Sequence, residues 1–454
     1  MAKPRRMVVI GGTAAGLSAA SKAKRLDPDL EITVFEKTGY ISYGACGLPY
    51  FVGGLIEKPE QLVSFSVEQM RDKRGIVVYI HHEVLSIDRG NKQVTVRNLE
   101  AEEVLTYQYE VLVIATGAVP VRPAIEGIDV QGVAFLRTVE DGILLKQHVQ
   151  GARCATIVGG GFIGLELAEE LTQVGVKVTL FEAMDRLLPF LPESFSQTVQ
   201  KTLEDHGVAV HLSAKIERIL SSEGTVRAVE TSDGIQTKAD LVILSVGVLP
   251  ATSLAREAGL ELGIKGSIVV NDRMQTSDNA IWACGDCAQM KHILTGKPVH
   301  VPLGTTANKM GKVAGSVIGG VDATFPGVLG SMVTKVFDLY IAATGFSLKE
   351  AKAAGYDAVQ SFITKADRAS YYPAGKPNTL NFVFDKETGL LLGAQGFGSE
   401  SIAGRINVLV ACITAGMTVF QVNELDLVYA PPVAPVYDPI LIAAGQAEKY
   451  VGRA

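Results

Sequence analysis

Two glycine-rich turns, each at the end of a short apolar run, constrain the fold of this chain most strongly. The first turn, residues 11–16, follows the apolar run 7–10 and opens an alanine-rich segment that ends near Leu26. A second strand-like run, residues 31–35, then ends at Glu36. This order predicts a βαβ unit. In such a unit the N–H groups at the helix start bind a pyrophosphate, and the acid about 20 residues later binds ribose hydroxyls.

The same arrangement returns about 150 residues later. Residues 155–158 are apolar, residues 159–164 match the glycine spacing in full, and a predicted helix is followed by a strand that ends at Glu182. In the first turn Thr13 stands where the middle glycine is expected, so that turn alone is a weak signal. Two units, each with an acid at the end of its second strand, predict two bound dinucleotides.

Three further segments fit the same pattern. Residues 111–117 and 241–247 are apolar strands that end in a tight glycine turn, and residues 281–286 form a strand that ends in Gly285 and Asp286. A carboxylate at that point can accept hydrogen bonds from the ribityl chain of a flavin. After about residue 325 the nucleotide signals stop, and we expect strands to alternate with helices in a separate domain. The predicted fold class is α/β with two Rossmann-like dinucleotide-binding domains.

Charge and cysteine content exclude several classes of protein. A net charge of −6 argues against general binding to nucleic acid or to an anionic membrane, and no apolar stretch approaches the length of a membrane span. Five scattered cysteines are typical of reduced thiols in a cytoplasm rather than of a disulfide framework. Residues 1–6 run into a strand without the apolar region of an export signal. We therefore expect a cytoplasmic protein whose partner is a small molecule.

Cys46 is the candidate reactive residue. It lies in Ser-Tyr-Gly-Ala-Cys-Gly-Leu-Pro-Tyr, residues 42–50, with no second cysteine near it in the chain. A thiol at the start of a helical turn can have its pKa lowered by the helix dipole and act as a nucleophile. The alternative on this residue alone is a small buried hydrophobe.

A second cysteine motif, Cys284 to Cys287, has the spacing of a redox dithiol. We interpret it differently, because Gly285 and Asp286 within it already have a predicted cofactor role. No second pair of cysteines lies at metal-binding spacing, so no metal site is predicted.

These motifs resemble those of the pyridine nucleotide-disulfide oxidoreductases along the whole chain, and specifically the branch with one active-site cysteine that includes the coenzyme A-disulfide reductases. The resemblance rests on residues 43–50, on the Gly-Asp segment, and on two C-terminal tyrosine motifs, residues 370–373 and 428–432. It implies FAD and NADH as cofactors, with NADPH as an alternative. It also implies a homodimer that acts on a small thiol or disulfide substrate based on coenzyme A.

The resemblance further implies a domain order. We expect an FAD-binding domain in two parts, residues 1–118 and 251–325, with an NAD(P)H-binding domain, residues 119–250, between them. An α+β dimerisation domain, residues 326–454, completes the chain. The residues implied for cofactor binding are Gly11, Gly12, Ala15, Gly16, Glu36, Lys37, Thr116, Gly117, Gly159, Gly161, Phe162, Ile163, Gly164, Glu182, Gly247, Gly285 and Asp286.

In the implied mechanism, electrons pass from nicotinamide through FAD to a disulfide that Cys46 forms with half of the substrate. Tyr371 and Tyr429, reaching in from the partner subunit, would protonate the departing thiol. Packing or backbone hydrogen bonding is the alternative for both tyrosines.

Five residues are implied for the coenzyme A moiety: Ser18, Lys22, Arg25, Ser42 and Arg74. Lys22 and Arg25 lie three apart on one predicted helix face, where they could clamp phosphates, and a solvated face is the alternative. Ala45 occupies a position where many coenzyme A-disulfide reductases have asparagine. The substrate therefore stays open between the disulfide and a persulfide or polysulfide of coenzyme A.

Glu182 favours NADH, because a carboxylate at this strand end repels the 2′-phosphate of NADPH, although Arg186 nearby weakens the argument. Two other functions stay open. One is an NADH oxidase that uses a sulfenic acid of Cys46. Peroxide- and oxygen-reducing relatives tend to carry a histidine in the first glycine loop, where this chain has Thr13, Ala14 and Ala15. The other is a non-catalytic flavoprotein that senses nucleotides.

Overall fold

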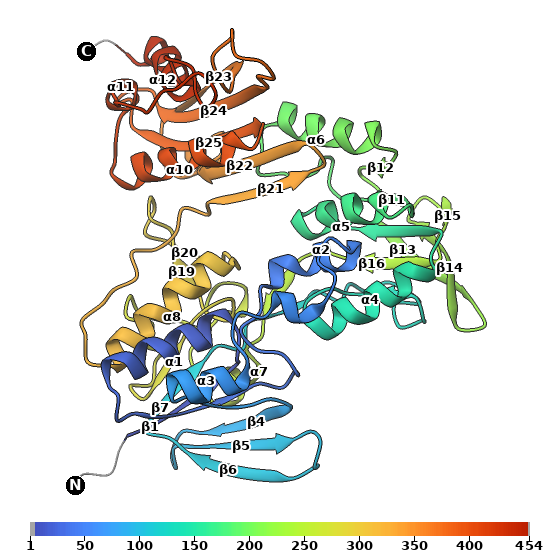
Figure 1. Ribbon diagram of the computed structural model, residues 1–454, viewed down its shortest axis with the longest axis vertical. Coiled ribbons are helices and arrows are strands. Elements are labelled where there is room, and N and C mark those ends of the chain that lie inside the picture. The colour runs from blue at the N-terminus through green and yellow to red at the C-terminus, as the bar shows by residue number, and fades with distance from the viewer. Residues whose placement is uncertain (1–4, 453–454) are drawn as a thin grey trace.

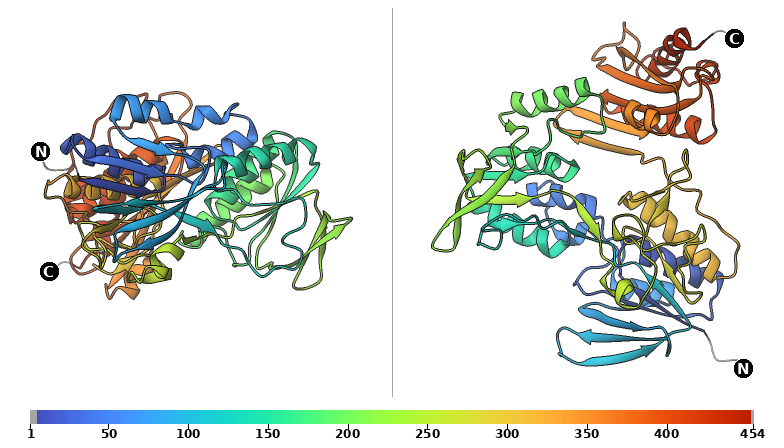
Figure 2. Two further views of the ribbon diagram at one scale, coloured as in Figure 1. Left: turned by 90° about the horizontal axis from the view of Figure 1, so that it is seen from below. Right: turned by 180° about the vertical axis from the view of Figure 1, so that it is seen from behind.

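Three five-stranded sheets organise the chain (Figures 1 and 2). The computed structural model describes residues 5–452. Part of the argument about an export signal rests on residues 1–4, which lie outside the described residues. Two of the sheets are parallel and contain the glycine turns, and the third is antiparallel. Parallel neighbours need crossover connections, whereas antiparallel strands can be joined by turns.

The first parallel sheet has the order β18-β7-β1-β2-β3. Its strands are β1 (Arg6–Ile10), β2 (Glu31–Phe35), β3 (Val77–Tyr79), β7 (Val111–Ile114) and β18 (Ile281–Ala283). Helix α3 (Val67–Arg74) precedes β3, and a meander of β4 (His82–Asp88), β5 (Gln93–Asn98) and β6 (Val104–Gln108) follows it. Helices α1 (Ala14–Leu26) and α8 (Gly304–Ile318) lie side by side (Figure 1). A Cβ atom at Gly311 would lie 2.3 Å from the carbonyl oxygen of Ala15, so glycine permits this close approach.

The second parallel sheet has the order β12-β11-β10-β16-β9. Its strands are β9 (Val133–Ala134), β10 (Cys154–Val158), β11 (Lys177–Phe181), β12 (Ala209–His211) and β16 (Leu241–Leu244). Helices α4 (Val139–Gly151), α5 (Phe162–Gln173) and α6 (Glu193–Asp205) accompany it, with a small sheet of β13 (Ile216–Ser222), β14 (Thr225–Thr231) and β15 (Gln236–Lys238). Strands β8 (Ala118–Pro120) and β17 (Val248–Pro250) pair where the chain enters and leaves this unit.

Both glycine turns lie at switch points of their sheets. Strand β1 has β2 on one side and β7 on the other, and β10 has β11 on one side and β16 on the other. Ligands of open α/β sheets bind beyond the carboxyl ends of the strands at such points. The topology therefore places a nucleotide site after β1 and another after β10.

The C-terminal sheet has the order β21-β22-β25-β24-β23 and is antiparallel throughout. Its strands are β21 (Met332–Val336), β22 (Leu339–Gly345), β23 (Ala358–Ala366), β24 (Pro377–Asp385) and β25 (Leu391–Gly398), and its helices are α9 (Leu348–Ala353), α10 (Ser401–Thr414), α11 (Val419–Asn423) and α12 (Pro439–Ala447). The expected alternation of strands and helices is wrong for β21 and β22 and again for β23 to β25. These strands follow one another as hairpins, because antiparallel neighbours need only turns between them.

The C-terminal sheet packs on the second nucleotide unit. Phe195 of α6 meets the ring of Phe397 of β25 edge to face, with 4.6 Å between the ring centroids. Buried residues of β21 and β22 share one hydrophobic cluster with the core around α5 and β10. The expected domain division and its boundaries stay predictions. Within residues 5–452 no helix is long and apolar enough to cross a membrane, and no group of three or more His, Cys, Asp or Glu residues could hold a metal ion.

Candidate active site

The first glycine turn presents an uncapped helix start. Gly11 has φ +107°, and a Cβ atom there would lie 2.2 Å from the carbonyl oxygen of Ala115, so only glycine fits between β1 and β7. Thr13 precedes α1 without a side-chain cap, and the first turn of α1, which contains Ala15 and Gly16, has no acidic residue. Free N–H groups and the positive end of the helix dipole favour a phosphate here.

Glu36 ends β2 beside this turn. Its carboxylate accepts hydrogen bonds from the backbone N–H of Gly12 (2.8 Å) and from the N–H and hydroxyl of Thr38 (3.0 and 2.9 Å). These bonds hold the buried carboxylate at the carboxyl edge of the sheet, where a ribose would lie. Lys37 next to it is exposed.

A second group of predicted cofactor residues meets across β7 and β18. Gly285 has φ +83°, and a Cβ atom there would lie 2.8 Å from Cβ of Ala15. The Asp286 carboxylate accepts a hydrogen bond from Arg137 at 2.9 Å. The Thr116 hydroxyl donates to the carbonyl oxygen of Ala251 at 2.6 Å. Gly117, with φ +71°, turns the chain next to the Arg137 guanidinium. The cradle of close-approach glycines, the uncapped helix and the two carboxylates fit a flavin dinucleotide.

The second glycine turn repeats the first. Gly159 has φ +110°, Gly161 precedes α5 without a side-chain cap, and Gly164 lies where a Cβ atom would be 2.1 Å from the carbonyl oxygen of Gly159. Glu182 accepts hydrogen bonds from the N–H groups of Gly160 (2.7 Å) and Met184 (2.8 Å). The equivalent geometry at Glu36 indicates that both turns bind the same kind of group.

The remaining predicted nucleotide residues surround this second turn. Phe162 is half-buried, and its ring centroid lies 5.8 Å from that of Phe190. Ile163 is exposed. Gly247, with φ +102°, accepts a hydrogen bond from the N–H of Val121 at 3.0 Å. These residues surround the carboxyl end of β10, where the topology places a nucleotide site.

Cys46 lies between the two nucleotide units. It is in a 3-10 turn, Ala45–Gly47, that leads into helix α2 (Leu48–Gly53), and α2 packs against α4 and α5 of the second unit. The Cys46 side chain is exposed, so a substrate can reach the sulfur. The expected position at the start of a helical turn is thus observed.

The expected lowering of the Cys46 pKa is wrong in direction. Partial burial by its neighbours raises the pKa of the Cys46 thiol, and the Glu166 and Asp286 carboxylates add to the increase. The Arg137 guanidinium lowers the pKa and does not offset these effects. A short helical turn supplies too little positive potential to offset the loss of hydration and the two carboxylates. The thiolate fraction, and with it the nucleophilicity of Cys46, therefore rises with pH.

Helix α5, which packs against α2, carries a cluster of three carboxylates: Glu166, Glu169 and Glu170. Burial raises the pKa of Glu166 to about 7, with Glu169 and Glu170 adding to the increase. Glu166 accepts a hydrogen bond from Thr334 of β21 at 3.1 Å, and Glu169 pairs with Lys335. The cluster thereby joins α5 to the C-terminal sheet.

All five residues predicted for coenzyme A line one hollow of about 630 Å³. Helices α1, α3 and α8 form its walls. Its basic residues are Lys22, Arg25, Arg74 and Lys312, and among the described residues that line it none is acidic. Arg74 stacks over the ring of Phe65, with 4.2 Å from its guanidinium carbon to the ring centroid. The hollow reaches Gly44, two residues before Cys46, so a long anionic ligand in it could place a sulfur atom near the Cys46 thiol.

Tyr371 and Tyr429 lie together but far from Cys46 of the same chain. Their hydroxyl groups are 2.8 Å apart, and both side chains are exposed, at 74% and 44%. The hydrogen bond with Tyr371 raises the pKa of Tyr429 above its ordinary value. Figure 1 places the β23–β24 turn, which carries Tyr371, at the far end of the C-terminal domain from α2.

Cys284 and Cys287 are both completely buried below the Gly-Asp turn, and burial raises the pKa of each thiol. The Cys287 thiol donates to the carbonyl oxygens of Ile114 and Cys284 at 3.4 Å. Thiols without access or thiolate character are poor redox groups, which supports the interpretation of this motif as structural.

Sequence reasoning missed three residues of this site. Arg137 carries no local motif, because only the tertiary fold brings it to Asp286. Lys312 joins the hollow through the packing of α8 on α1. Glu166 had a detectable signal, since it is an acid two residues after Gly164 in an apolar helix start.

Comparison with protein families gives two matches. Residues 5–311 match the pyridine nucleotide-disulphide oxidoreductases, and residues 332–438 match the dimerisation domain of the same enzymes. Together the matches cover nearly all of the chain.

Individual relatives match over almost their full length. A coenzyme A-dependent NAD(P)H sulfur oxidoreductase of Pyrococcus abyssi is 41% identical, with 97% of each chain covered. An NADH oxidase of Methanocaldococcus jannaschii is 36% identical, with 98% of this chain and 99% of the relative covered. The solved structure of an NAD-dependent persulfide reductase from A. fulgidus has a TM-score of 0.95 and 39% identity, covering 98% of this chain and 83% of that one.

Proposed function

Because the chain belongs to the pyridine nucleotide-disulphide oxidoreductases, we propose that it uses NADH to reduce a disulfide or persulfide of coenzyme A through Cys46. The chain is an FAD-dependent oxidoreductase with a C-terminal dimerisation domain. The observation that carries the substrate proposal is the basic hollow that ends two residues before Cys46. Its four cations suit the phosphates of coenzyme A, and its lining reaches Gly44, so the thiol end of the ligand would lie near Cys46.

In this proposal the Cys46 thiolate attacks the S–S bond of the substrate at the sulfur atom that belongs to coenzyme A. The Cys46 S–S bond forms as the S–S bond of the substrate breaks, and the leaving group is a second coenzyme A thiolate or hydrosulfide. The first glycine turn, Glu36 and Asp286 would hold the flavin, and a bound flavin would supply the route by which two electrons from the nicotinamide reach sulfur. Cleavage of the mixed disulfide returns the Cys46 thiolate and free coenzyme A.

The leaving thiolate needs a proton, and a phenol can donate it. Tyr371 and Tyr429 lie too far from Cys46 within one chain, so they would serve Cys46 of the partner subunit in a homodimer. The match to a dimerisation domain supports this arrangement. The hydrogen bond with Tyr371 raises the pKa of Tyr429, so this phenol carries its proton at neutral pH.

An NADH oxidase is the second candidate, and the similarity to the NADH oxidase of M. jannaschii favours it. In that reaction oxygen, not a disulfide, would accept the electrons. The first glycine loop argues against it, since Thr13, Ala14 and Ala15 supply no imidazole as proton donor. Oxygen consumption with NADH and no thiol substrate, if it equals the rate of disulfide reduction, would favour the oxidase.

The non-catalytic alternative is set aside, because the family assignment makes the chain an oxidoreductase. The proposed compartment is the cytoplasm. All five cysteines are unpaired in the structure, as expected in a reducing compartment.

The substrate proposal is tested by removing the phosphates from the substrate. We expect pantethine, the disulfide without the nucleotide half, to have a kcat/KM about fivefold lower than coenzyme A disulfide, because partly exposed ion pairs contribute up to ~1 kcal/mol. The loss should appear in KM, since the phosphates lie far from the reacting sulfur. Steady-state NADH oxidation measures both constants. Equal KM values for the two disulfides would contradict the assignment of the hollow.

Glu182 is expected to set the preference for NADH. In Glu182→Gln, the ratio of kcat/KM for NADH to kcat/KM for NADPH should fall by about fivefold. This is the effect expected when one partly screened charge is removed. Arg186 does not reverse the preference, because it pairs with Asp185 at 3.1 Å. The matched control is Asp185→Asn, which frees Arg186 and should improve KM for NADPH alone. A wild-type enzyme that prefers NADPH would contradict this assignment.

A further inference from the structure

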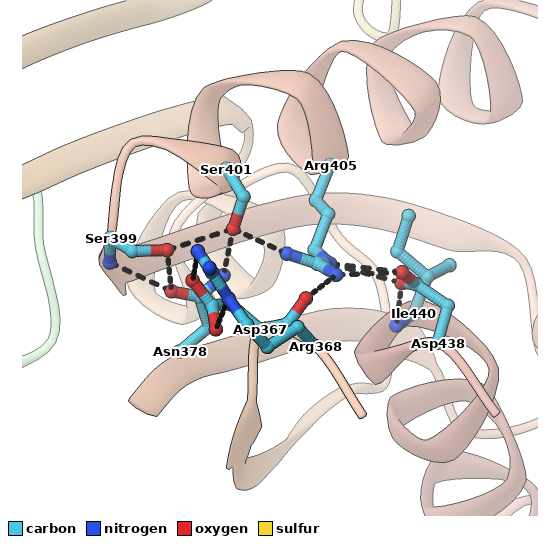
Figure 3. Close-up of polar contacts among 8 residues, drawn as sticks. All are labelled: Asp367, Arg368, Asn378, Ser399, Ser401, Arg405, Asp438 and Ile440. Atoms are coloured by element: carbon cyan, nitrogen blue, oxygen red, sulfur yellow. Dashed lines mark hydrogen bonds and ion pairs between the residues drawn. The ribbon is translucent and has the colours of Figure 1, made fainter. Parts of the chain in front are cut away.

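Among the described cations of the C-terminal domain that form ion pairs, Arg405 is the most buried (Figure 3). It lies on α10 with only 6% of its surface exposed. Its guanidinium donates to the Asp438 carboxylate at 2.8 to 3.1 Å, to the hydroxyl of Ser401 at 2.5 Å, and to the carbonyl oxygen of Asp367 at 2.9 Å. One side chain therefore binds three separate points of the chain.

Two of these points are the bases of the tyrosine loops. Asp367 and Lys376 are the two ends of the loop 367–376, which carries Tyr371. The N–H of Asp367 donates to the carbonyl oxygen of Lys376 at 2.8 Å, and the N–H of Lys376 donates to the Asp367 carboxylate at 2.9 Å. Asp438 ends the loop 424–438, which carries Tyr429, and caps α12 by accepting from the N–H of Ile440 at 2.9 Å.

Above these bases little else connects the two loops. The N–H of Ala369 donates to the carbonyl oxygen of Pro431 at 3.3 Å, and the two tyrosine hydroxyls are in contact at 2.8 Å. The tyrosine rings are exposed, so core packing does not fix their positions. The place of each phenol is set mainly by the backbone below it.

We infer that Arg405 is a positioning residue for catalysis, which holds the two tyrosine loops in register so that Tyr429 and Tyr371 reach the leaving sulfur. The inference rests on the proposed role of these phenols as proton donors. Arginine suits this task because its planar fork binds a carboxylate through two N–H groups and keeps further donors for Ser401 and Asp367. A shift of about 1 Å at a donor can cost on the order of 10²-fold in rate.

The test uses variants that keep the charge or the shape of the pair. Arg405→Lys retains a cation but loses the planar guanidinium. Asp438→Asn removes the charge of the partner carboxylate and serves as the second variant if Arg405→Lys does not fold. For each we expect kcat with coenzyme A disulfide to fall about fivefold. With an aryl disulfide whose thiolate leaves without a proton, kcat should stay within about twofold of the wild-type value. In a Tyr371→Phe/Tyr429→Phe background neither variant should slow coenzyme A disulfide reduction further, because both of the groups being positioned are already gone.

A control separates positioning from general destabilisation. Asn381→Ala removes a buried hydrogen bond to Gln395 (2.7 Å) on the sheet of the same domain, away from both loops. It should lower the melting temperature and leave the ratio of rates with the two disulfides unchanged. An altered ratio in Asn381→Ala, or additive losses when Arg405→Lys is combined with Tyr371→Phe/Tyr429→Phe, would overturn the inference. If Tyr429→Phe alone leaves the ratio unchanged, the proposed proton donor is wrong and the inference falls with it.

Discussion

Replacing Cys46→Ser is expected to lower kcat/KM for coenzyme A disulfide by about 10⁴-fold or more, because removal of a nucleophile eliminates the covalent route. A serine hydroxyl cannot exchange with a disulfide. Flavin binding should persist, since the residues that fit the flavin, Gly11, Glu36 and Asp286, do not hydrogen-bond to the Cys46 side chain. Flavin reduction by NADH, followed in a stopped-flow experiment, should remain within a few-fold of the wild-type rate.

The matched control is Cys154→Ser in β10. The Cys154 thiol donates to the Asp240 carboxylate at 3.3 Å, and a serine hydroxyl can make the same bond. This variant should keep nearly full activity. Substantial disulfide reduction by Cys46→Ser, or an equal loss in Cys154→Ser, would assign the chemistry to another group. Mass spectrometry of the substrate-treated enzyme gives an independent readout, because the coenzyme A adduct should form on Cys46 and be absent from the serine variant.

Tyr429→Phe should slow the reduction of coenzyme A disulfide about tenfold or more. General acid catalysis is typically worth about 10²- to 10⁴-fold, and the Tyr371 hydroxyl, 2.8 Å away, can replace part of it. Coenzyme A leaves as a basic thiolate, so its departure benefits from the proton. An aryl disulfide leaves as a stable anion and should be reduced at nearly the wild-type rate.

The contrast between the two disulfides is the decisive measurement. Tyr372→Phe is the matched control, because this phenol is less exposed than its neighbour Tyr371 and is not in the hydrogen bond with Tyr429. It should leave both rates unchanged. Equal slowing of both substrates by Tyr429→Phe would mean that Tyr429 packs the subunit interface or supports the flavin site. A Tyr371→Phe/Tyr429→Phe variant should lose more with coenzyme A disulfide than either single variant.

Local chemistry along the chain was enough to predict the two nucleotide units. A glycine at positive φ, an uncapped helix start and an acid at the end of the second strand all lie within about 25 residues, so Gly11 and Glu36, like Gly159 and Glu182, could be paired from spacing alone. The same holds for Lys22 and Arg25, because three-residue spacing puts both on one face of α1. Cys46 could be proposed as a nucleophile from its isolated position and its motif.

The electrostatics and the reach of the site depended on contacts between distant segments. The upward shift of the Cys46 pKa comes first from burial and then from the carboxylates of Glu166 and Asp286, which lie on α5 and after β18. The local sequence around Cys46 reveals neither effect. Lys312 enters the hollow because α8 packs on α1 almost 290 residues later. Arg405 joins Asp367 to Asp438 across the C-terminal domain. Short-range spacing determines backbone turns and helix faces, whereas the field at a thiol and the anchoring of a loop are sums over neighbours that only the folded chain brings together.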